Sequence, residues 1–196
     1  MKIGLAPFSY LLGAIPSGYI LFYLSEKKDI RKFGSRSTGA TNVLRLKGWK
    51  LALPVVAIDI GKGIIPVLTA QKFVQDNNFA LICAFLAVLG HCFPVYIKFR
   101  GGKGVATTLG IYALVAFKPF LLSLAVFLVV VGLSRYVSLG SLLATLGFPL
   151  FVLLLREQTE LAYLGLALFL LITYKHRENI LRLARGQERK FGEKAQ

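Results

Sequence analysis

Long apolar runs, separated by short segments rich in lysine and arginine, dominate this sequence. The runs are continuous rather than alternating, which favours helices embedded in lipid over the strands of a membrane barrel. Seven such runs can be drawn, and several are shorter than the ~20 residues that a full membrane span requires. They cover residues 4–24, 51–71, 78–97, 105–117, 119–134, 138–155 and 160–174. The pattern predicts an all-α membrane protein.

The runs on either side of Lys118-Pro119 fit either one long helix or two short ones. The positive-inside rule separates these alternatives, because cytoplasmic loops carry most of the lysine and arginine. With one helix, Arg135 and the basic C-terminal tail would lie on the opposite side of the membrane from the other basic loops. With two helices, most of the 24 basic residues gather on one side, and the other side keeps only Lys2, Lys72, Lys118 and Arg156. We therefore predict seven transmembrane helices, some of them short, with the N-terminus outside and the C-terminus in the cytoplasm.

Composition agrees with this class. The chain has 196 residues, of which 56% are hydrophobic, with a formal charge of +15 and a mean hydropathy of +0.65. A basic soluble protein would suggest nucleic acid as the partner, but apolar runs of this length favour a membrane instead. Cys83 and Cys92 lie too close along one run to cross-link different parts of the fold, so free thiols are expected.

The first apolar run is longer than the 7–15-residue core of a signal peptide, so we interpret it as an uncleaved first span. Linkers, repeats and low-complexity segments are not evident. We expect a single transmembrane domain over residues 1–181 and a basic cytoplasmic tail over 182–196, which is a surface helix or disordered.

A glycine-rich turn, Gly101-Gly102-Lys103-Gly104, precedes the helical pattern that resumes at Val105. Glycines let backbone N–H groups converge on an anion, and a helix N-terminus adds partial positive charge. The spacing is not that of a Walker A motif. The alternative is a basic loop that only marks the cytoplasmic side. The helix after this turn is short, which predicts a phosphate site recessed into the membrane edge.

The first basic loop, Gly34 to Arg45, concentrates residues that bind phosphate oxygens. Ser35, Thr41 and Asn42 offer neutral donors, and Arg45 is suited to a bidentate phosphate contact. The alternative is an ordinary capped loop entering an amphipathic helix.

Two further groups of polar residues follow near the ends of the last apolar runs. Ser141 lies at the start of the sixth run, as a helix cap or as a donor to a bound phosphate. His176 and Asn179 follow the seventh run and share a helix face, because they are three residues apart.

Asp59 and Lys62 are charged residues in the middle of the second run, also three residues apart. Charges inside lipid are costly and usually paired. A mutual salt bridge that locks helix packing is favoured over a functional role.

Three segments together resemble the bacterial acyl-phosphate:glycerol-3-phosphate acyltransferases, which are small integral membrane enzymes. The first matching motif is Gly34 to Arg45, and the second begins Gly90-His91-Cys92-Phe93-Pro94 and continues through Gly101-Gly102-Lys103-Gly104 to Ala106. The third is His176-Arg177-Glu178-Asn179. The family commonly has Gly-Asn where this chain has Arg36-Ser37, so no role is transferred to those two residues.

The resemblance implies transfer of a fatty acyl group from acyl phosphate to the 1-hydroxyl of glycerol 3-phosphate. The products are 1-acylglycerol 3-phosphate (lysophosphatidic acid) and phosphate, at the first step of phospholipid synthesis. It also implies a multi-pass enzyme of the bacterial inner membrane with its active site facing the cytoplasm. Acyl phosphate, glycerol 3-phosphate and membrane lipid are the expected partners, and no nucleic acid, metal or other cofactor is expected.

With the resemblance, the predicted site contains two sets of residues. Arg45 and Lys103 are expected to hold two anionic substrates together, since phosphates repel one another unless cations lie between them. His91, His176 or a substrate phosphate would accept the hydroxyl proton. The catalytic set is Ser35, Arg45, His91, Lys103 and Asn179, and the substrate-binding set is Thr41, Asn42, Gly101, Gly102, Gly104, Ser141 and His176. The competing hypothesis is a small membrane transporter of an organic phosphate.

Overall fold

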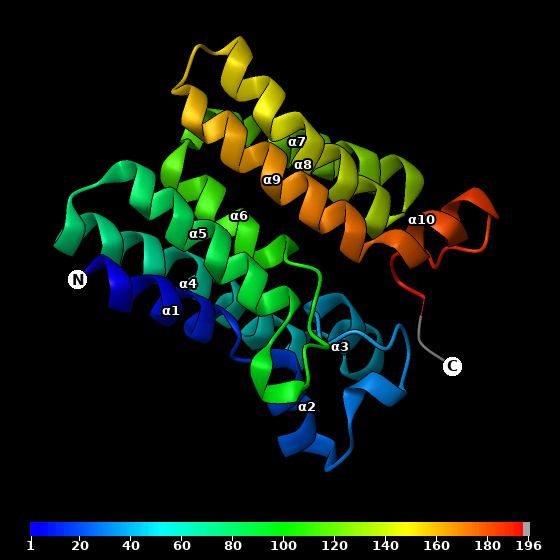
Figure 1. The fold of residues 1–196 in the computed structure, drawn as a ribbon. Coiled ribbons are helices and arrows are strands. Elements are labelled where there is room, and N and C mark those ends of the chain that lie inside the picture. Colours follow the sequence, from blue (N-terminus) through cyan, green and yellow to red (C-terminus); the bar gives the residue numbers. More distant parts are fainter. Residues whose placement is uncertain (194–196) are drawn as a thin grey trace. The chain divides into compact units, whose positions relative to one another are not determined.

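The computed structural model describes residues 1–193, and every regular element among them is a helix (Figure 1). The predicted all-α class is therefore confirmed. Residues 194–196 of the predicted tail lie outside the described residues. The elements are α1 (Lys2–Gly13), α2 (Ser17–Glu26), η1 (Ile30–Lys32), α3 (Ala40–Lys47), α4 (Trp49–Val74), α5 (Asn77–Cys92), η2 (Val95–Ile97), α6 (Val105–Val115), α7 (Phe117–Ser134), α8 (Val137–Leu154), α9 (Thr159–Lys175) and α10 (Arg177–Ala184).

Five stretches of the described chain are long and apolar enough to cross a membrane, and α6 is a shorter apolar helix. The five stretches are Lys2–Glu26, Trp49–Val74, Asn77–Ile97, Phe117–Ser134 and Val137–Leu154. This agrees with an integral membrane protein. The seven-span count and the orientation of the termini stay predictions.

The predicted division near Lys118-Pro119 is confirmed as a break between two helices. α6 ends at Val115 and α7 begins at Phe117, because Ala116 leaves the helical region with φ −154° and ψ 82°. Pro119 lies in the first turn of α7, where a backbone N–H has no partner within the helix and its loss costs little.

The first apolar run, expected as one uncleaved span, consists of two helices separated by a short break. α1 ends at Gly13 and α2 begins at Ser17, with Pro16 as the residue before α2. Proline has no N–H to donate and disfavours the helical conformation in the residue before it, which is Ile15. The break exposes backbone carbonyl groups near the middle of an otherwise apolar stretch.

The described residues form two compact units, Met1–Gly110 and Ile111–Glu193, and each is described by itself. In the first unit, α5 packs against α1 and α4. Glycines permit the close crossing of α1 and α5, because a Cβ on Gly13 would lie 2.1 Å from the Ala87 carbonyl oxygen. A Cβ on Gly90 would lie equally close, at 2.1 Å, to the carbonyl oxygen of Tyr10. Small residues at such crossings are typical of membrane helices.

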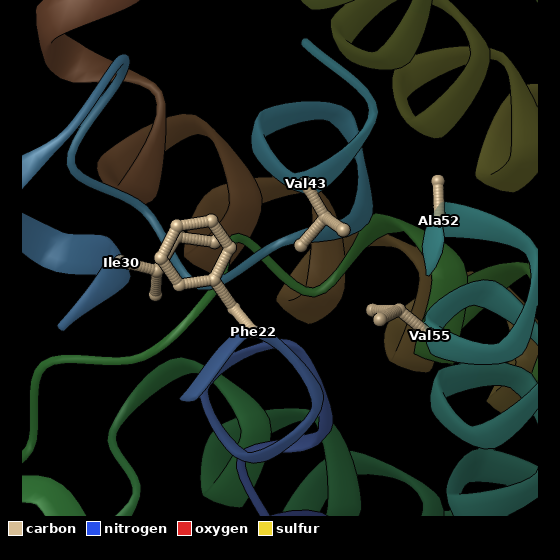
Figure 2. Packing of buried hydrophobic residues seen from close by; sticks show 5 residues of the cluster. All are labelled: Phe22, Ile30, Val43, Ala52 and Val55. Carbon is tan, nitrogen blue, oxygen red and sulfur yellow. The ribbon is translucent and has the colours of Figure 1, made fainter. Parts of the chain in front are cut away.

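The first unit contains a buried apolar cluster (Figure 2). Its side chains come from α2, η1, α3 and α4, and all of them are at least nine-tenths buried. The cluster consists of Phe22, Ile30, Val43, Ala52 and Val55. Burial of this apolar surface ties the short helices η1 and α3, which have few hydrogen bonds of their own, to the longer helices.

In the second unit, α8 packs against both α7 and α9, and α10 packs against α8 and α9. Gly165 of α9 faces Phe148 and Pro149 of α8, where an added Cβ would lie 2.9 Å from the Phe148 ring. The predicted tail begins as the last part of α10 and then turns at Gly186, whose φ is +67°.

The described part of the tail is neither disordered nor confined to the surface, because Glu188 is buried. One carboxylate oxygen of Glu188 accepts hydrogen bonds from Ser138 Oγ at 2.9 Å and Asn179 Nδ2 at 2.6 Å. The other accepts from Arg182 Nε at 2.8 Å. Burial opposes the charge, but these hydrogen bonds outweigh it and hold the pKa of Glu188 below its ordinary value. The tail is therefore fastened to α8 and α10 by a single carboxylate.

We expect Gly13→Ala to destabilise the protein by about 1–3 kcal/mol, because the new methyl group forces α1 and α5 apart. Gly61→Ala is the matched control, since nothing lies within 4 Å of a Cβ at that position of α4. Thermal unfolding in detergent, followed by exposure of the buried thiols of Cys83 and Cys92, measures both variants. An unchanged transition for Gly13→Ala would contradict the close crossing.

We also expect Glu188→Ala to cost about 2–3 kcal/mol, because charged hydrogen bonds are lost and their donors stay behind. The loss should be complete above pH 4.5, the ordinary pKa of this carboxyl. It should shrink as the pH falls through the lowered folded pKa, where the wild-type carboxylate is protonated too. Unfolding measured by circular dichroism tests this, with Glu193→Ala as the control at an exposed tail carboxylate.

Candidate functional site

The first loop is organised by the side chain of Asn42, which is only 1% exposed on α3. Its amide oxygen accepts the backbone N–H of Ser35 at 2.9 Å. Its amide nitrogen donates to the carbonyl oxygens of Phe33 at 3.2 Å and Ser37 at 2.9 Å. Both amide hydrogens are engaged in this way. The side chain of Asn42 thus holds the loop that carries Ser35, and its contact with substrate stays a prediction.

Thr41 and Arg45 lie four residues apart on α3, so they share one face of this helix, and both are partly buried. Thr38 and Gly39 precede α3, and the Thr38 backbone approaches α2 so closely that a Cβ on Gly18 would lie 2.0 Å from its carbonyl oxygen. The residue before α3 is Gly39 and no side chain caps this helix, so the side-chain cap of the alternative interpretation is absent from α3. Phosphate binding by Thr41 and Arg45 stays a prediction.

The first loop and the glycine-rich loop lie together at one end of the first unit. Arg31 Nη1 donates to the carbonyl oxygen of Ile97 at 2.9 Å, which links η1 to η2 directly. Asp29 fixes the Arg31 guanidinium through three further contacts, the shortest at 2.7 Å. These hydrogen bonds from Arg31 hold the pKa of Asp29 below its ordinary value.

The glycines of the second loop are required by the backbone and ring of His91. A Cβ on Gly101 would lie 2.2 Å from the His91 carbonyl oxygen, and one on Gly102 would lie 2.1 Å from Nε2 of the imidazole. The Gly102 N–H donates to the His91 carbonyl oxygen at 3.1 Å. The N–H of Gly102 therefore already has a partner within the chain. Binding of phosphate by the amides of this loop stays a prediction.

Gly104 marks the start of α6, since its carbonyl oxygen accepts the N–H of Thr108 at 2.9 Å. Its φ of +89° lies in the left-handed region that favours glycine. Lys103 comes directly before it and is partly buried. The predicted arrangement of a lysine at the N-terminal end of a helix is therefore present.

In the second unit, the predicted residues lie near the start of α8 and the junction of α9 and α10. Ser141 is 2% exposed, and its hydroxyl donates to the Val137 carbonyl oxygen at 2.8 Å within its own helix. His176 is 2% exposed, and its Nδ1 lies 2.8 Å from the Ile172 carbonyl oxygen. A carbonyl oxygen can only accept, so Nδ1 carries a proton, and Nε2 is the nitrogen that can act as an acceptor when the ring is neutral.

Asn179 is 5% exposed, and its side-chain amide donates to Glu188 of the tail. The sequence reasoning assigned Asn179 to catalysis and did not identify Glu188 or Arg182 as its neighbours. Arg31 was also missed as the link between the two loops. The available signal was weak: Glu188 is one of two acids in a mostly basic tail, two residues after Gly186.

The predicted salt bridge in the second span is present, with Lys62 Nζ 2.8 Å from Asp59 Oδ1. Both side chains are at most 4% exposed. Among the described residues, no group of three or more His, Cys, Asp and Glu side chains has the arrangement of a metal site.

Comparison with known proteins gives a consistent result. The profile described as glycerol-3-phosphate acyltransferase matches residues 3–186. The glycerol-3-phosphate acyltransferase of Thermoanaerobacter pseudethanolicus is 42% identical over 191 residues, covering 97% of this chain and 96% of the relative. That of Leptospira borgpetersenii serovar Hardjo-bovis is 42% identical over 189 residues, covering 92% of this chain and 87% of the relative.

Two solved structures are also similar. One is PlsY (YgiH), an integral membrane glycerol 3-phosphate acyltransferase, in its glycerol 3-phosphate form, with a TM-score of 0.91 and 40% identity. The alignment covers 97% of this chain and 96% of that one. The other is the lysophosphatidic acid form, with a TM-score of 0.87 and 38% identity over 97% and 95% of the two chains. This chain therefore belongs to the glycerol-3-phosphate acyltransferase family.

Proposed function

We propose that this protein transfers a fatty acyl group from acyl phosphate to the 1-hydroxyl of glycerol 3-phosphate. The hydroxyl oxygen attacks the acyl carbonyl carbon, and the bond from that carbon to the phosphate oxygen breaks. The products are 1-acylglycerol 3-phosphate and inorganic phosphate, with the hydroxyl proton passing to a base. The reaction supplies the first intermediate of phospholipid synthesis.

The observation that carries this proposal is the joining of the two basic loops through Arg31 and Ile97. One loop leads into α3 with Arg45, and the other leads into α6 with Lys103. Both substrates carry phosphate, and two such anions repel one another strongly unless cations are held near them. Fixed cations favour the approach of the substrates and stabilise the charge that develops on the leaving phosphate.

We assign only some of the predicted neutral donors to contact with substrate, because others have partners within the chain. Ser35 and Thr41 are proposed to contact substrate, together with the N-terminal end of α6 at Gly104, where partial positive charge favours an anion. Asn42 is assigned to holding the loop, and Gly101 and Gly102 to the close approach of His91. Ser141, His176 and Asn179 in the second unit are kept as proposed substrate-contacting residues.

The base is proposed to be a substrate phosphate or a histidine. Phosphate is a good leaving group, so the reaction needs little assistance from a strong base. The tautomer of His176, with its proton on Nδ1, makes Nε2 of that ring the nitrogen suited to accept a proton. His91 has its imidazole against Gly102, which favours a role in shaping the loop.

We further propose that residues 1–181 act as one transmembrane domain in the bacterial inner membrane, with seven spans and the N-terminus outside. The active-site loops and the basic tail would then face the cytoplasm. The basic residues of these segments support this orientation by the positive-inside rule.

The decisive experiment mixes the purified protein in detergent with palmitoyl phosphate and glycerol 3-phosphate. Release of inorganic phosphate that depends on both substrates, with formation of lysophosphatidic acid, is the expected result. A transporter of organic phosphate, the competing hypothesis, would release none.

Lys103→Ala and Arg45→Ala are each expected to lower kcat/KM by a factor of about 100 or more, because each removes a cation from the anionic transition state. Lys98→Ala is the matched control, since Lys98 is an exposed cation of the same loop, and it should change kcat/KM less than about threefold. Phosphate release per folded protein is the measurement. Wild-type rates in the Lys103 or Arg45 variant would remove that residue from the site.

Single cysteines test the proposed orientation, in a background where Cys83 and Cys92 are replaced by alanine. Lys98→Cys should react with a membrane-impermeant maleimide only when the cytoplasmic face is accessible. Asn77→Cys should react from the outside, because it follows the second proposed span. Labelling of both positions from the same side would exclude the seven-span topology.

A further inference from the structure

In the first unit, His91 belongs to a buried polar cluster whose other three members have no role in the reaction as proposed. It contains Ser17 at the start of α2, Asp59 and Lys62 of α4, and His91 near the end of α5. Their exposed fractions are 4%, 1%, 4% and 6%. All four lie within or beside stretches apolar enough to cross a membrane.

Asp59 is the centre of this cluster. Its Oδ1 accepts a hydrogen bond from Ser17 Oγ at 2.5 Å and lies 2.8 Å from Lys62 Nζ. The same oxygen lies 3.6 Å from Nδ1 of His91, a contact that becomes an ion pair when the imidazole is protonated. Lys62 donates in turn to the carbonyl oxygen of Ile15, at the break that precedes Pro16. The cluster therefore joins the α1–α2 break, α4 and α5 through one carboxylate.

Helix packing alone does not require such a cluster. A buried ion pair costs desolvation energy that its attraction repays only in part, and apolar residues of similar size often pack with equal or greater stability. Ionisable side chains within membrane spans are therefore usually functional. The contacts of His91 indicate what this function is.

His91 connects the cluster to the glycine-rich loop. Its imidazole contacts Gly102 so closely that no side chain fits there, and its carbonyl oxygen accepts the Gly102 N–H at 3.1 Å. Gly101 contacts the same carbonyl group, since its Cβ would lie 2.2 Å from the oxygen. Lys103 follows Gly102 directly along the chain. A rotation of the His91 ring would therefore displace the backbone directly before the proposed phosphate ligand.

We propose that Asp59 is a positioning residue which, supported by Lys62 and Ser17, fixes the ring of His91 and thereby the glycine-rich loop before Lys103. The carboxylate attracts the Nδ1 side of the imidazole, so the opposite edge of the ring, with Nε2, stays against Gly102. This inference rests on the proposed acyltransferase function. It gives the mid-membrane charges a role in substrate binding in addition to their mutual salt bridge.

The test uses the double variant Asp59→Asn/Lys62→Met, which removes both charges and preserves side-chain volume. A purely structural pair predicts altered thermal unfolding with wild-type kinetics in the folded fraction. The positioning role predicts a KM about tenfold higher for at least one phosphate substrate, with kcat changed less than about threefold. Wild-type KM values for both substrates in the folded double variant would overturn the proposal.

A second variant covers the case in which the double variant does not fold. Ser17→Ala removes one hydrogen bond to Asp59 without changing a charge, and it should raise the same KM about threefold. Ser9→Ala is the matched control, because Ser9 is a buried serine of α1 that bonds to the Leu5 carbonyl oxygen of its own helix. Equal KM values in Ser17→Ala and Ser9→Ala would also overturn the proposal.

A double-mutant cycle identifies the route through the histidine. If Asp59 acts through His91, the change in KM caused by Asp59→Asn/Lys62→Met should be absent in a His91→Gln background. Additive effects would mean that Asp59 acts on substrate binding by another route. Absence of phosphate release by the wild-type protein would count against the proposed function itself, which separates that failure from failure of the positioning role.

Discussion

Backbone groups that leave a helix within or beside lipid need hydrogen-bond partners from the chain itself, because hydrocarbon offers none. Several breaks in the described helices have a polar side chain that meets this need. Lys62 donates to Ile15 at the break before Pro16, Arg31 donates to Ile97, and the Asn42 amide donates to two carbonyl groups of the first loop. The loops that carry the proposed phosphate ligands are held in this way by partly buried hydrogen bonds, in addition to the apolar packing around Phe22 and Val43.

This constraint changes how the polar residues of the motifs are interpreted. Asn42 and Gly102 are of the types that bind phosphate, yet the amide of the first and the N–H of the second are engaged within the chain. Asn179 likewise donates to Glu188. A motif residue that holds a loop is as necessary to activity as one that touches substrate, because a small displacement of a catalytic group costs much of the rate. Loss of activity in a variant therefore does not separate these roles, whereas KM, kcat and stability measured together do.

The buried polar cluster around Asp59 extends the same principle. Pro16 breaks the first span, and the Ile15 carbonyl oxygen at this break accepts hydrogen bonds from the Ser17 N–H and from Lys62 Nζ. The second of these bonds places a cation in an apolar environment. Asp59 balances that cation and also lies beside His91. The break between α1 and α2 is thus connected, through Lys62 and Asp59, to His91, against which the glycine-rich loop packs. The break before Pro16, Lys62, Asp59 and His91 are therefore linked by successive contacts.

The sequence by itself determined the all-helical membrane class, the break between the fourth and fifth apolar runs, the Asp59–Lys62 pair and the family. These features depend on local composition and spacing. The length of an apolar run, the position of a proline and an i, i+3 separation are all given by the order of residues along the chain. Only the tertiary structure decided that Asn42 holds its own loop, that Arg31 joins two loops, that Glu188 returns from the tail to Ser138, and that Gly102 lies against His91. Those contacts join residues whose partners depend on how helices cross and where loops turn. Spacing along the chain does not encode such encounters, because they arise from packing among many residues at once.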